Sequence, residues 1–177
     1  GTILSTYPDM KLVLDAATTF GCPFDGEATL QQVMDYVQRA YDLGIRDIDL
    51  CDTIGVATPV QVERTVLALR EKFPDVTFGV HIHDTRNMGM ACSLVAMQCG
   101  LTRVSTTVGG LGGCPFAPGA SGNTASEDFV YTAQKMGIDT GVDFEKLLDT
   151  AKYLREKVPG NYSGHQINIQ KPQCTMG

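Results

Sequence analysis

The sequence has little positive charge and no long apolar run, and both absences narrow the classes of protein to which it can belong. Its 177 residues include 14 Lys and Arg against 20 Asp and Glu, which gives a formal net charge of −6 at pH 7. Because no basic cluster offsets this acidity, nucleic acid is disfavoured as a partner. No apolar run approaches the roughly 20 residues of a membrane-spanning helix, and no signal-peptide pattern opens the chain. We therefore expect no membrane partner.

The cysteines lack the paired spacing of zinc knuckles and redox motifs. They are Cys22, Cys51, Cys92, Cys99, Cys114 and Cys174. We expect reduced thiols, most of them small buried side chains, and a cytoplasmic location. The chain begins Gly1-Thr2-Ile3 without an initiator Met, so we expect a fragment of a longer protein. A missing N-terminus leaves the mitochondrial matrix open as a second location.

Apolar and polar residues follow one another in four strand-then-helix units. Strands are expected at 11–18, 45–51, 76–83 and 103–108. Helices are expected to follow these strands from Thr29, Thr58, the region of Ala91 and Ser126, with a further helix after Asp143. The first nine residues are expected to be a polar, turn-like lead-in, and residues 160–177 a loosely held tail. The pattern fits either an open doubly wound sheet or part of a (β/α)₈ barrel, of which four units are half.

Two of the three histidines stand at the end of the third expected strand. Side chains alternate along a strand, so His81 and His83 point to one face and Ile82 and Asp84 to the other. Neutral imidazole is the commonest metal ligand, and the pair therefore indicates a divalent metal site. The alternative is a pair of hydrogen-bonded core histidines. A hard metal would also be expected to have a carboxylate ligand, but Asp84 faces away.

Polar side chains also follow the other expected strands, at the same edge of the sheet. Asp52 is placed either to hydrogen-bond a substrate or a histidine, or to form an Asx turn before a helix. Cys114 lies on a glycine-rich loop that could close over a substrate and let the thiol exchange a proton. Asn123 ends that loop and can lend an oxygen to a metal or cap a helix. Mixed nitrogen and oxygen ligands suit Mg²⁺, Mn²⁺ or Zn²⁺.

Four segments resemble 3-hydroxy-3-methylglutaryl-CoA lyases, in the same order along the chain. They are FGCPFDG at 20–26, DTIGVATP at 52–59, HIHDT at 81–85 and GLGGCPFAPGASGN at 110–123. The last segment is highly specific, and the match extends over about residues 10–157. The resemblance implies an α/β fold in which residues 1–177 form a single partial domain, the second half of a TIM (β/α)₈ barrel with strands five to eight.

The resemblance also implies roles for the residues that match the family's motifs. These are His81, His83 and Asn123 as ligands of Mg²⁺ or Mn²⁺, Cys114 and Asp52 as catalytic residues, and Thr53 and Glu127 as substrate-site residues. The family's fourth ligand, an Asp beside a catalytic Arg, belongs to the first half of the barrel, which this sequence does not contain. After the histidines the family has Thr-Tyr-Gly, whereas this chain has Thr85-Arg86-Asn87, a departure expected to alter substrate preference or loop shape.

The implied reaction is metal-dependent cleavage of 3-hydroxy-3-methylglutaryl-CoA to acetyl-CoA and acetoacetate. The implied partners are an acyl-CoA substrate and either a second copy of the chain or the missing N-terminal half. One alternative is a Claisen-condensing synthase of the same barrel group, although those enzymes usually lack a Gly-Gly-Cys-Pro loop. Another is a non-catalytic truncated or split half-barrel.

Overall fold

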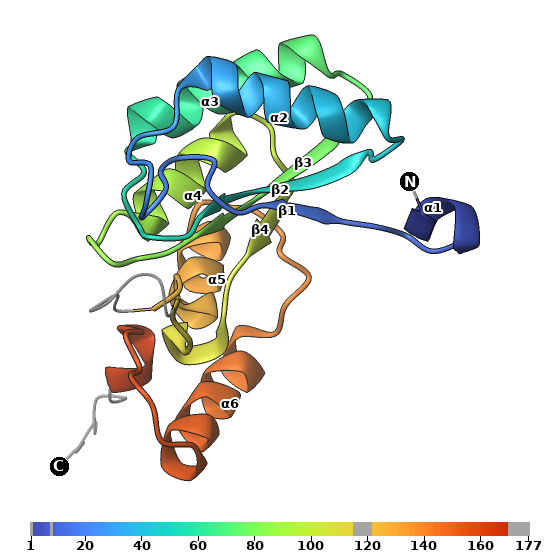
Figure 1. Ribbon diagram of the computed structural model, residues 1–177. Coiled ribbons are helices and arrows are strands. Elements are labelled where there is room, and N and C mark those ends of the chain that lie inside the picture. The colour runs from blue at the N-terminus through green and yellow to red at the C-terminus, as the bar shows by residue number, and fades with distance from the viewer. Residues whose placement is uncertain (1, 8, 115–121, 170–177) are drawn as a thin grey trace, which may run out of the picture. The chain divides into compact units, whose positions relative to one another are not determined.

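The structure is a computed structural model that describes residues 2–7, 9–114 and 122–169. In chain order its elements are α1 (Thr2–Thr6), β1 (Leu14–Ala16), α2 (Leu30–Asp42), β2 (Asp47–Asp52), α3 (Pro59–Lys72), β3 (Thr77–Ile82), α4 (Gly89–Gln98), β4 (Arg103–Ser105), η1 (Val108–Gly110), α5 (Ser126–Lys135), α6 (Phe144–Lys157) and η2 (Gln166–Asn168) (Figure 1). They form two compact units. The first holds the described residues up to 105 together with Cys114, and the second holds 106–113 and 122–169.

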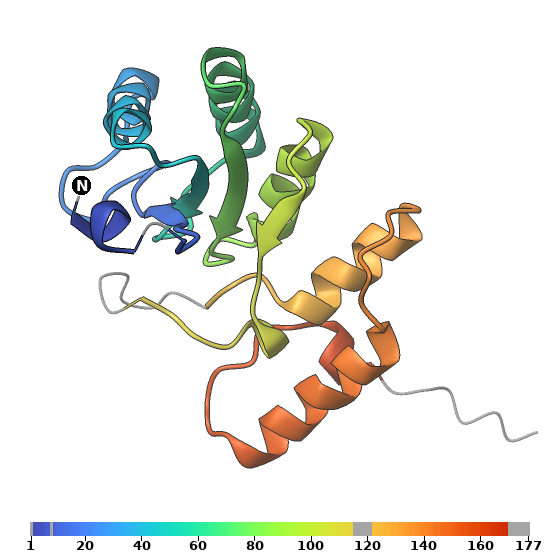
Figure 2. The same ribbon diagram turned by 90° about the vertical axis from the view of Figure 1, so that its right-hand side faces the viewer.

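The first unit is built on a parallel sheet with the strand order β1-β2-β3-β4. Parallel neighbours need a crossover connection, and α2, α3 and α4 each provide one. All three helices lie on the same side of the sheet (Figure 2). Because the strands are parallel, their carboxyl ends lie at the same end of the sheet. This arrangement confirms the expected α/β fold and is consistent with part of a barrel.

The two faces of the sheet differ sharply in chemistry. Alternation places Ile48, Leu50, Val80 and Ile82 against the helices, where they form a buried core with side chains such as Val37, Val62, Val66 and Leu69. The opposite face, called the polar face below, carries Asp15, Asp47, Asp49, Cys51, Gly79, His81, Arg103 and Ser105. The helix-covered face therefore supplies stability, and the polar face holds groups capable of chemistry.

Capping residues fix where the helices of the first unit begin. The Thr29 hydroxyl accepts the Gln32 backbone N–H and the Gln32 side chain accepts the Thr29 N–H, which together form a capping box for α2. The Thr58 hydroxyl accepts the Gln61 backbone N–H and so caps α3, and Pro59 occupies its first turn. Both helix starts were expected from the sequence and are confirmed.

The second unit packs α5 against α6 and ties the following segment to them. Phe129, Ala133 and Ala151 are buried, as is Ile167 of η2. The Asp128 carboxylate accepts the backbone N–H groups of His165 and Gln166, each at 2.7 Å. Residues up to 169 are thus held more firmly than the expected loose tail, and residues 170–177 lie outside the described residues.

The structure differs from the sequence-based expectation at the chain start and at the strand ends. Thr2–Thr6 forms the short helix α1 instead of a turn-like lead-in. The fourth strand ends at Ser105 because the backbone turns into η1 from Val108. Across the part of the chain that the structure describes, no helix combines the length and apolarity needed to cross a bilayer.

Candidate functional site

His81 lies on the polar face of β3, and its ring orientation is fixed by a neighbouring strand. Its Nδ1 is 3.2 Å from the backbone carbonyl of Ser105 on β4. A carbonyl can only accept, so Nδ1 carries the proton and Nε2 keeps a lone pair. A backbone carbonyl that orients a metal-binding histidine in this way is a common arrangement. His81 is therefore half of a nitrogen donor pair with a defined tautomer.

His83 stands beside it, with ring centroids 5.2 Å apart and the planes at 83°. The His83 side chain is buried, and its Nδ1 has no hydrogen-bond partner among the described residues. Burial lowers the pKa of His83, the neighbouring His81 lowers it further, and Asp52 opposes both. The neutral imidazole, which is the form that binds metals, is therefore favoured. The expected common direction of His81 and His83 is what the structure has.

Asp52 is buried in the loop that follows β2. Its two oxygens accept the backbone N–H groups of Val56 at 3.0 Å and Ala57 at 2.8 Å. Burial raises the pKa of this carboxyl, while the backbone hydrogen bonds and His83 oppose the rise. These contacts are those of the turn alternative, and the catalytic role of Asp52 stays a prediction. The Thr53 hydroxyl donates to the Ala17 carbonyl, and its role in substrate binding also stays a prediction.

The departure from the family pattern at 85–87 shapes the loop after β3. The Arg86 guanidinium donates to the carbonyls of Ile54 and Gly55, each at 3.0 Å, and so ties this loop to the one after β2. Asn87 has a φ of 57°, the left-handed region that glycine adopts most readily. Arg86 thus links the two loops by hydrogen bonds. Asn87 adopts the left-handed backbone conformation that the glycine of the family pattern would also allow.

In the second unit, hydrogen bonds within its own loop hold Asn123 but leave its side-chain oxygen without a partner among the described residues. Its Nδ2 donates to the Leu111 carbonyl at 3.1 Å, and its backbone N–H donates to the Gly110 carbonyl at 3.2 Å. The side chain is buried, and Oδ1 has no hydrogen-bond partner among the described residues. An amide oriented in this way presents its oxygen, the atom that a hard cation binds.

Glu127 is fully buried in α5 and supports the same turn. Its Oε2 accepts the Gly109 backbone N–H at 2.8 Å, whereas Oε1 has no partner in the described part of the chain. Burial raises the pKa of Glu127 and its backbone hydrogen bonds oppose the rise. Gly164 packs directly against Oε1, where a larger residue would collide with it. Glu127 thus braces the backbone beside Asn123, and its expected contact with substrate stays a prediction.

The cysteines separate into two groups by exposure. Cys51, Cys92 and Cys99 are buried, and burial raises the pKa of Cys51 and of Cys92 to about 12. Cys114 and Cys22 are half-buried free thiols. Residues 115–121, which continue the loop after Cys114, lie outside the described residues, and so does Cys174. Among the described thiols, Cys114 is both partly exposed and placed on the glycine-rich loop.

The donor atoms fit a divalent cation, but they do not complete a site by themselves. Among the described residues, no group of three or more His, Cys, Asp or Glu side chains is placed to hold a metal ion. What the chain offers is two imidazole nitrogens and one amide oxygen. Leaving a polar atom buried and unpaired costs about 1–3 kcal/mol. A cation bound at Asn123 Oδ1 would remove that cost for the amide, and one bound at His83 Nδ1 would remove it for the imidazole.

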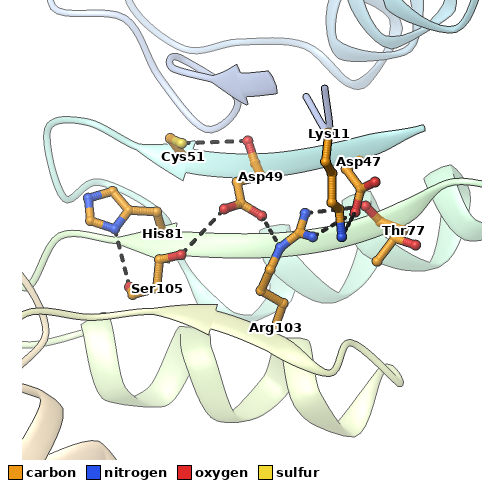
Figure 3. A network of polar contacts seen from close by, with 8 residues as sticks. All are labelled: Lys11, Asp47, Asp49, Cys51, Thr77, His81, Arg103 and Ser105. Atoms are coloured by element: carbon orange, nitrogen blue, oxygen red, sulfur yellow. Dashed lines mark hydrogen bonds and ion pairs between the residues drawn. The ribbon is translucent and has the colours of Figure 1, made fainter. Parts of the chain in front are cut away.

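One set of polar residues was missed by the sequence analysis. Asp49 and Asp47 on β2 both bind Arg103 on β4, and Ser105 binds Asp49 in turn (Figure 3). The signal was present in Asp47-Ile48-Asp49-Leu50, where charged and apolar residues alternate at strand spacing. Such alternation indicates a strand with a polar face and an apolar face.

Comparisons with known proteins agree with this arrangement. A model of the HMGL-like family matches residues 9–154. Hydroxymethylglutaryl-CoA lyase YngG of Bacillus subtilis is 44% identical over 155 residues, which are 88% of this chain and 52% of that protein. (R)-citramalyl-CoA lyase of Chloroflexus aurantiacus is 42% identical over 76% of this chain and 43% of its own length.

A solved structure of an HMG-CoA lyase from Acinetobacter baumannii, in complex with coenzyme A and 3-methylmalate, superposes with a TM-score of 0.89. It is 35% identical and covers 98% of this chain and 57% of its own. The chain thus spans about half the length of the curated relatives it matches. Since the family model covers most of its residues, the chain belongs to the HMGL-like family, and these relatives are lyases.

Proposed function

We propose that the chain provides strands five to eight of a TIM-barrel lyase that cleaves 3-hydroxy-3-methylglutaryl-CoA to acetyl-CoA and acetoacetate. The observation that carries this proposal concerns two buried atoms, one on His83 and one on Asn123, that have no hydrogen-bond partner in the described part of the chain. Both residues stand at positions that match the family's metal-ligand motif. The B. subtilis relative supports the substrate, and the coenzyme A complex of the A. baumannii protein supports an acyl-CoA ligand.

In this proposal His81, His83 and Asn123 hold Mg²⁺ or Mn²⁺, together with a carboxylate from the first half of the barrel. When bound, the cation supplies Lewis acidity that makes the substrate hydroxyl easier to deprotonate. The chain prepares its donors in advance. Ser105 fixes the tautomer of His81, burial keeps His83 neutral, and Leu111 turns the Asn123 amide so that Oδ1 is available.

The proton transfers are assigned to Asp52 and Cys114. Asp52 is the proposed base for the 3-hydroxyl proton, a role that suits a carboxyl with a raised pKa. Carbon–carbon cleavage then releases acetoacetate and leaves the enolate of acetyl-CoA. The Cys114 thiol donates its proton to the enolate carbon. Thr53 and Glu127 shape the substrate site, and Glu127 does so by holding the Gly109 N–H.

A second candidate is cleavage of an acyl-CoA with a different branch. The C. aurantiacus relative, a citramalyl-CoA lyase, is almost as similar as the B. subtilis lyase. Arg86 also replaces the tyrosine of the family pattern, so the loop after β3 has a different side chain. A Claisen-condensing synthase and an inactive half-barrel are the remaining alternatives.

The test is an assay of the chain alone and of a chimera that places the first half of the B. subtilis lyase before Gly1. Each is incubated with Mn²⁺ or with a chelator and offered 3-hydroxy-3-methylglutaryl-CoA or citramalyl-CoA. We expect the chimera to release acetyl-CoA from the first substrate, and the chelator to abolish this activity. A chimera that folds and cleaves neither substrate overturns the lyase proposal.

The roles of single residues are tested in the same chimera. Cys114→Ala should lower kcat by roughly 100-fold or more, as expected for loss of a proton donor. Cys22→Ala is the matched control, because it removes another half-buried thiol. Full activity in Cys114→Ala would contradict the proton-donor role, and full activity in His83→Ala would contradict metal binding by that residue.

A further inference from the structure

We propose that Asp49 and Arg103 are positioning residues for His81, acting through Ser105. The proposal rests on the proposed function only in taking His81 to be a metal ligand. None of the three residues is needed to explain the apolar core, which lies on the other face of the sheet. They form a polar chain that ends at the His81 imidazole.

The first link spans three strands. Asp49, Gly79 and Arg103 stand in one register row across β2, β3 and β4. Arg103 Nε reaches over β3 to Asp49 Oδ1 at 2.7 Å, and its Nη1 reaches Asp47 Oδ1 at 2.9 Å. Gly79 makes this possible, because a Cβ there would overlap the Asp49 carboxylate and the Arg103 guanidinium. The ion pair thus connects β2 and β4 across β3.

The second link lies one row further along the strands. Cys51, His81 and Ser105 stand in register there, and the Ser105 hydroxyl donates to the remaining Asp49 oxygen at 3.3 Å. The carbonyl of the same Ser105 accepts the Nδ1 proton of His81. Both oxygens of Asp49 are therefore used, one by the side chain of Arg103 and one by Ser105 (Figure 3). The residue that orients His81 is itself held by the pair.

The Asp49–Arg103 ion pair is more buried than an ordinary surface ion pair and is therefore expected to restrain the strands more strongly. The Asp49 side chain is 9% exposed and that of Arg103 27%, against 53% and 39% for Asp75 and Arg46. Burial of Arg103 works to lower its pKa, but hydrogen bonds to Asp47 and Asp49 raise it overall. β4 has only three residues, so few backbone bonds fix its register. The pair supplies restraint that the short strand lacks.

The test uses the chain without metal and the tautomer of His81 as its main readout. In ¹⁵N-histidine NMR spectra, assigned with a His81→Gln variant, wild-type His81 should carry its proton on Nδ1. Asp49→Asn should leave a mixture of tautomers, because Arg103 keeps only Asp47 as a charged partner and Ser105 loses its carboxylate acceptor. Gly79→Ala should do the same without removing either charge. Ser105→Ala keeps the carbonyl and removes only the hydroxyl link, so it should give a smaller shift.

Mn²⁺ binding, followed by electron paramagnetic resonance of the free ion, gives the second readout. Asp49→Asn and Gly79→Ala should weaken binding by roughly 10-fold, the lower end expected for a residue behind a metal ligand. Arg103→Lys keeps the charge and should fall between wild type and Asp49→Asn. Asp75→Asn, which removes an exposed Arg–Asp pair in the same unit, is the control and should change neither readout.

The outcomes separate this inference from the proposed function. If the His81 tautomer is unchanged in folded Asp49→Asn, Gly79→Ala and Ser105→Ala, the positioning role is wrong even when wild type binds Mn²⁺. A second outcome is that the His81 tautomer shifts in the variants while neither the wild-type chain nor the chimera with the first half of the B. subtilis lyase binds Mn²⁺. In that case the positioning role holds and the metal proposal fails. Ser105→Ala removes a single hydroxyl, so it tests the link even where Gly79→Ala does not fold.

Discussion

At the scale of the single residue, burial decides which polar groups can act. Asp52 is buried but engaged by backbone N–H groups, whereas Asn123 and Glu127 each keep one buried oxygen without a partner among the described residues. An unpaired buried oxygen is costly and remains only where something else favours it. Such atoms therefore distinguish candidate functional groups from structural ones. Sequence position alone makes no such distinction.

The Glu127 carboxyl is expected to make stability depend on pH. Burial raises its pKa from the ordinary 4.5, so the folded protein holds this proton more tightly than the unfolded chain. The stabilisation is fully present below the unfolded pKa and is lost as the pH rises through the folded pKa. Urea unfolding from pH 4 upward should show this loss. Glu127→Gln should remove this pH dependence and be more stable by about 1 kcal/mol at neutral pH, because the buried group then carries no charge.

Conversely, Glu127→Asp shortens the side chain and should lose the Gly109 contact while keeping a titratable group. An identical pH dependence in wild type and Glu127→Gln would contradict the assignment of the effect to this carboxyl.

Asn87 is expected to accept glycine and to resist β-branched residues. Its φ of 57° is the only positive value among the described non-glycine residues. Left-handed backbone costs an ordinary residue about 1–2 kcal/mol, and asparagine less. Asn87→Val should lower the free energy of unfolding by roughly that amount, while Asn87→Gly should change it little. Equal stability of the two variants in urea would show that the loop adopts another conformation.

Thiol reactivity should follow exposure. With a pKa of about 12, Cys51 and Cys92 hold roughly a thousandth of the thiolate of an ordinary cysteine near pH 7. In the native protein a maleimide should label Cys114 and Cys22 and leave Cys51 and Cys92 unmodified, as read by peptide mass spectrometry. In urea all four should react. Rapid labelling of Cys92 in the native state would mean that α4 opens easily.

At the scale of the element, the sequence was most informative where local chemistry determines the outcome. The threonine caps at Thr29 and Thr58 predicted two helix starts correctly, and alternation predicted which way the histidines point. Strand length was predicted less well. Leu14–Ala16 is shorter than expected because the parallel ladder with β2 covers only those residues, and pairing depends on a partner far along the chain.

The candidate site shows the same limit. Each motif residue was recognisable, whereas the contact between Asp49 and Arg103 joins positions 54 apart in the chain. Nothing local in either strand specifies that pairing. The division into two units was also unexpected, because the boundary after Ser105 falls inside residues 101–108, which contain no glycine or proline.

The capping box of α2 yields a prediction at this scale. Thr29→Ala removes the hydroxyl that accepts the Gln32 N–H and should lower the free energy of unfolding by about 1 kcal/mol. Thr29→Ser keeps the hydroxyl acceptor and should retain most of the stability that the cap provides. Urea unfolding followed by circular dichroism measures both. Equal losses in the two variants would assign the effect to the threonine methyl group instead of the cap.

At the scale of the whole molecule, the sheet of the first unit has an unprotected edge. β1 has a single strand neighbour, β2, among the described residues, and its other edge is free to pair with another chain. Val13, next to β1, is 47% exposed and adds apolar surface there. Both features favour association with another chain.

We therefore expect the chain by itself to sediment as a dimer or larger species. Val13→Lys places a charge beside the free edge and should shift the distribution toward monomer. Val60→Lys alters a more exposed valine at the start of α3 and serves as the control. A wild-type chain that sediments as a monomer would contradict this expectation.

Gly79 also constrains how this sheet can change during evolution. A side chain cannot be added there while Asp49 and Arg103 meet above it. Loss of Arg103 would leave the buried Asp49 carboxylate without its ion-pair partner, and loss of Asp49 would leave Arg103 only Asp47. The three positions therefore cannot drift independently, and the order of substitutions matters. A lineage that gains alanine at 79 must move the Asp49 and Arg103 side chains apart or replace them. Saturation libraries at 49, 79 and 103 should accordingly yield active sequences as matched sets, with few viable single changes between them.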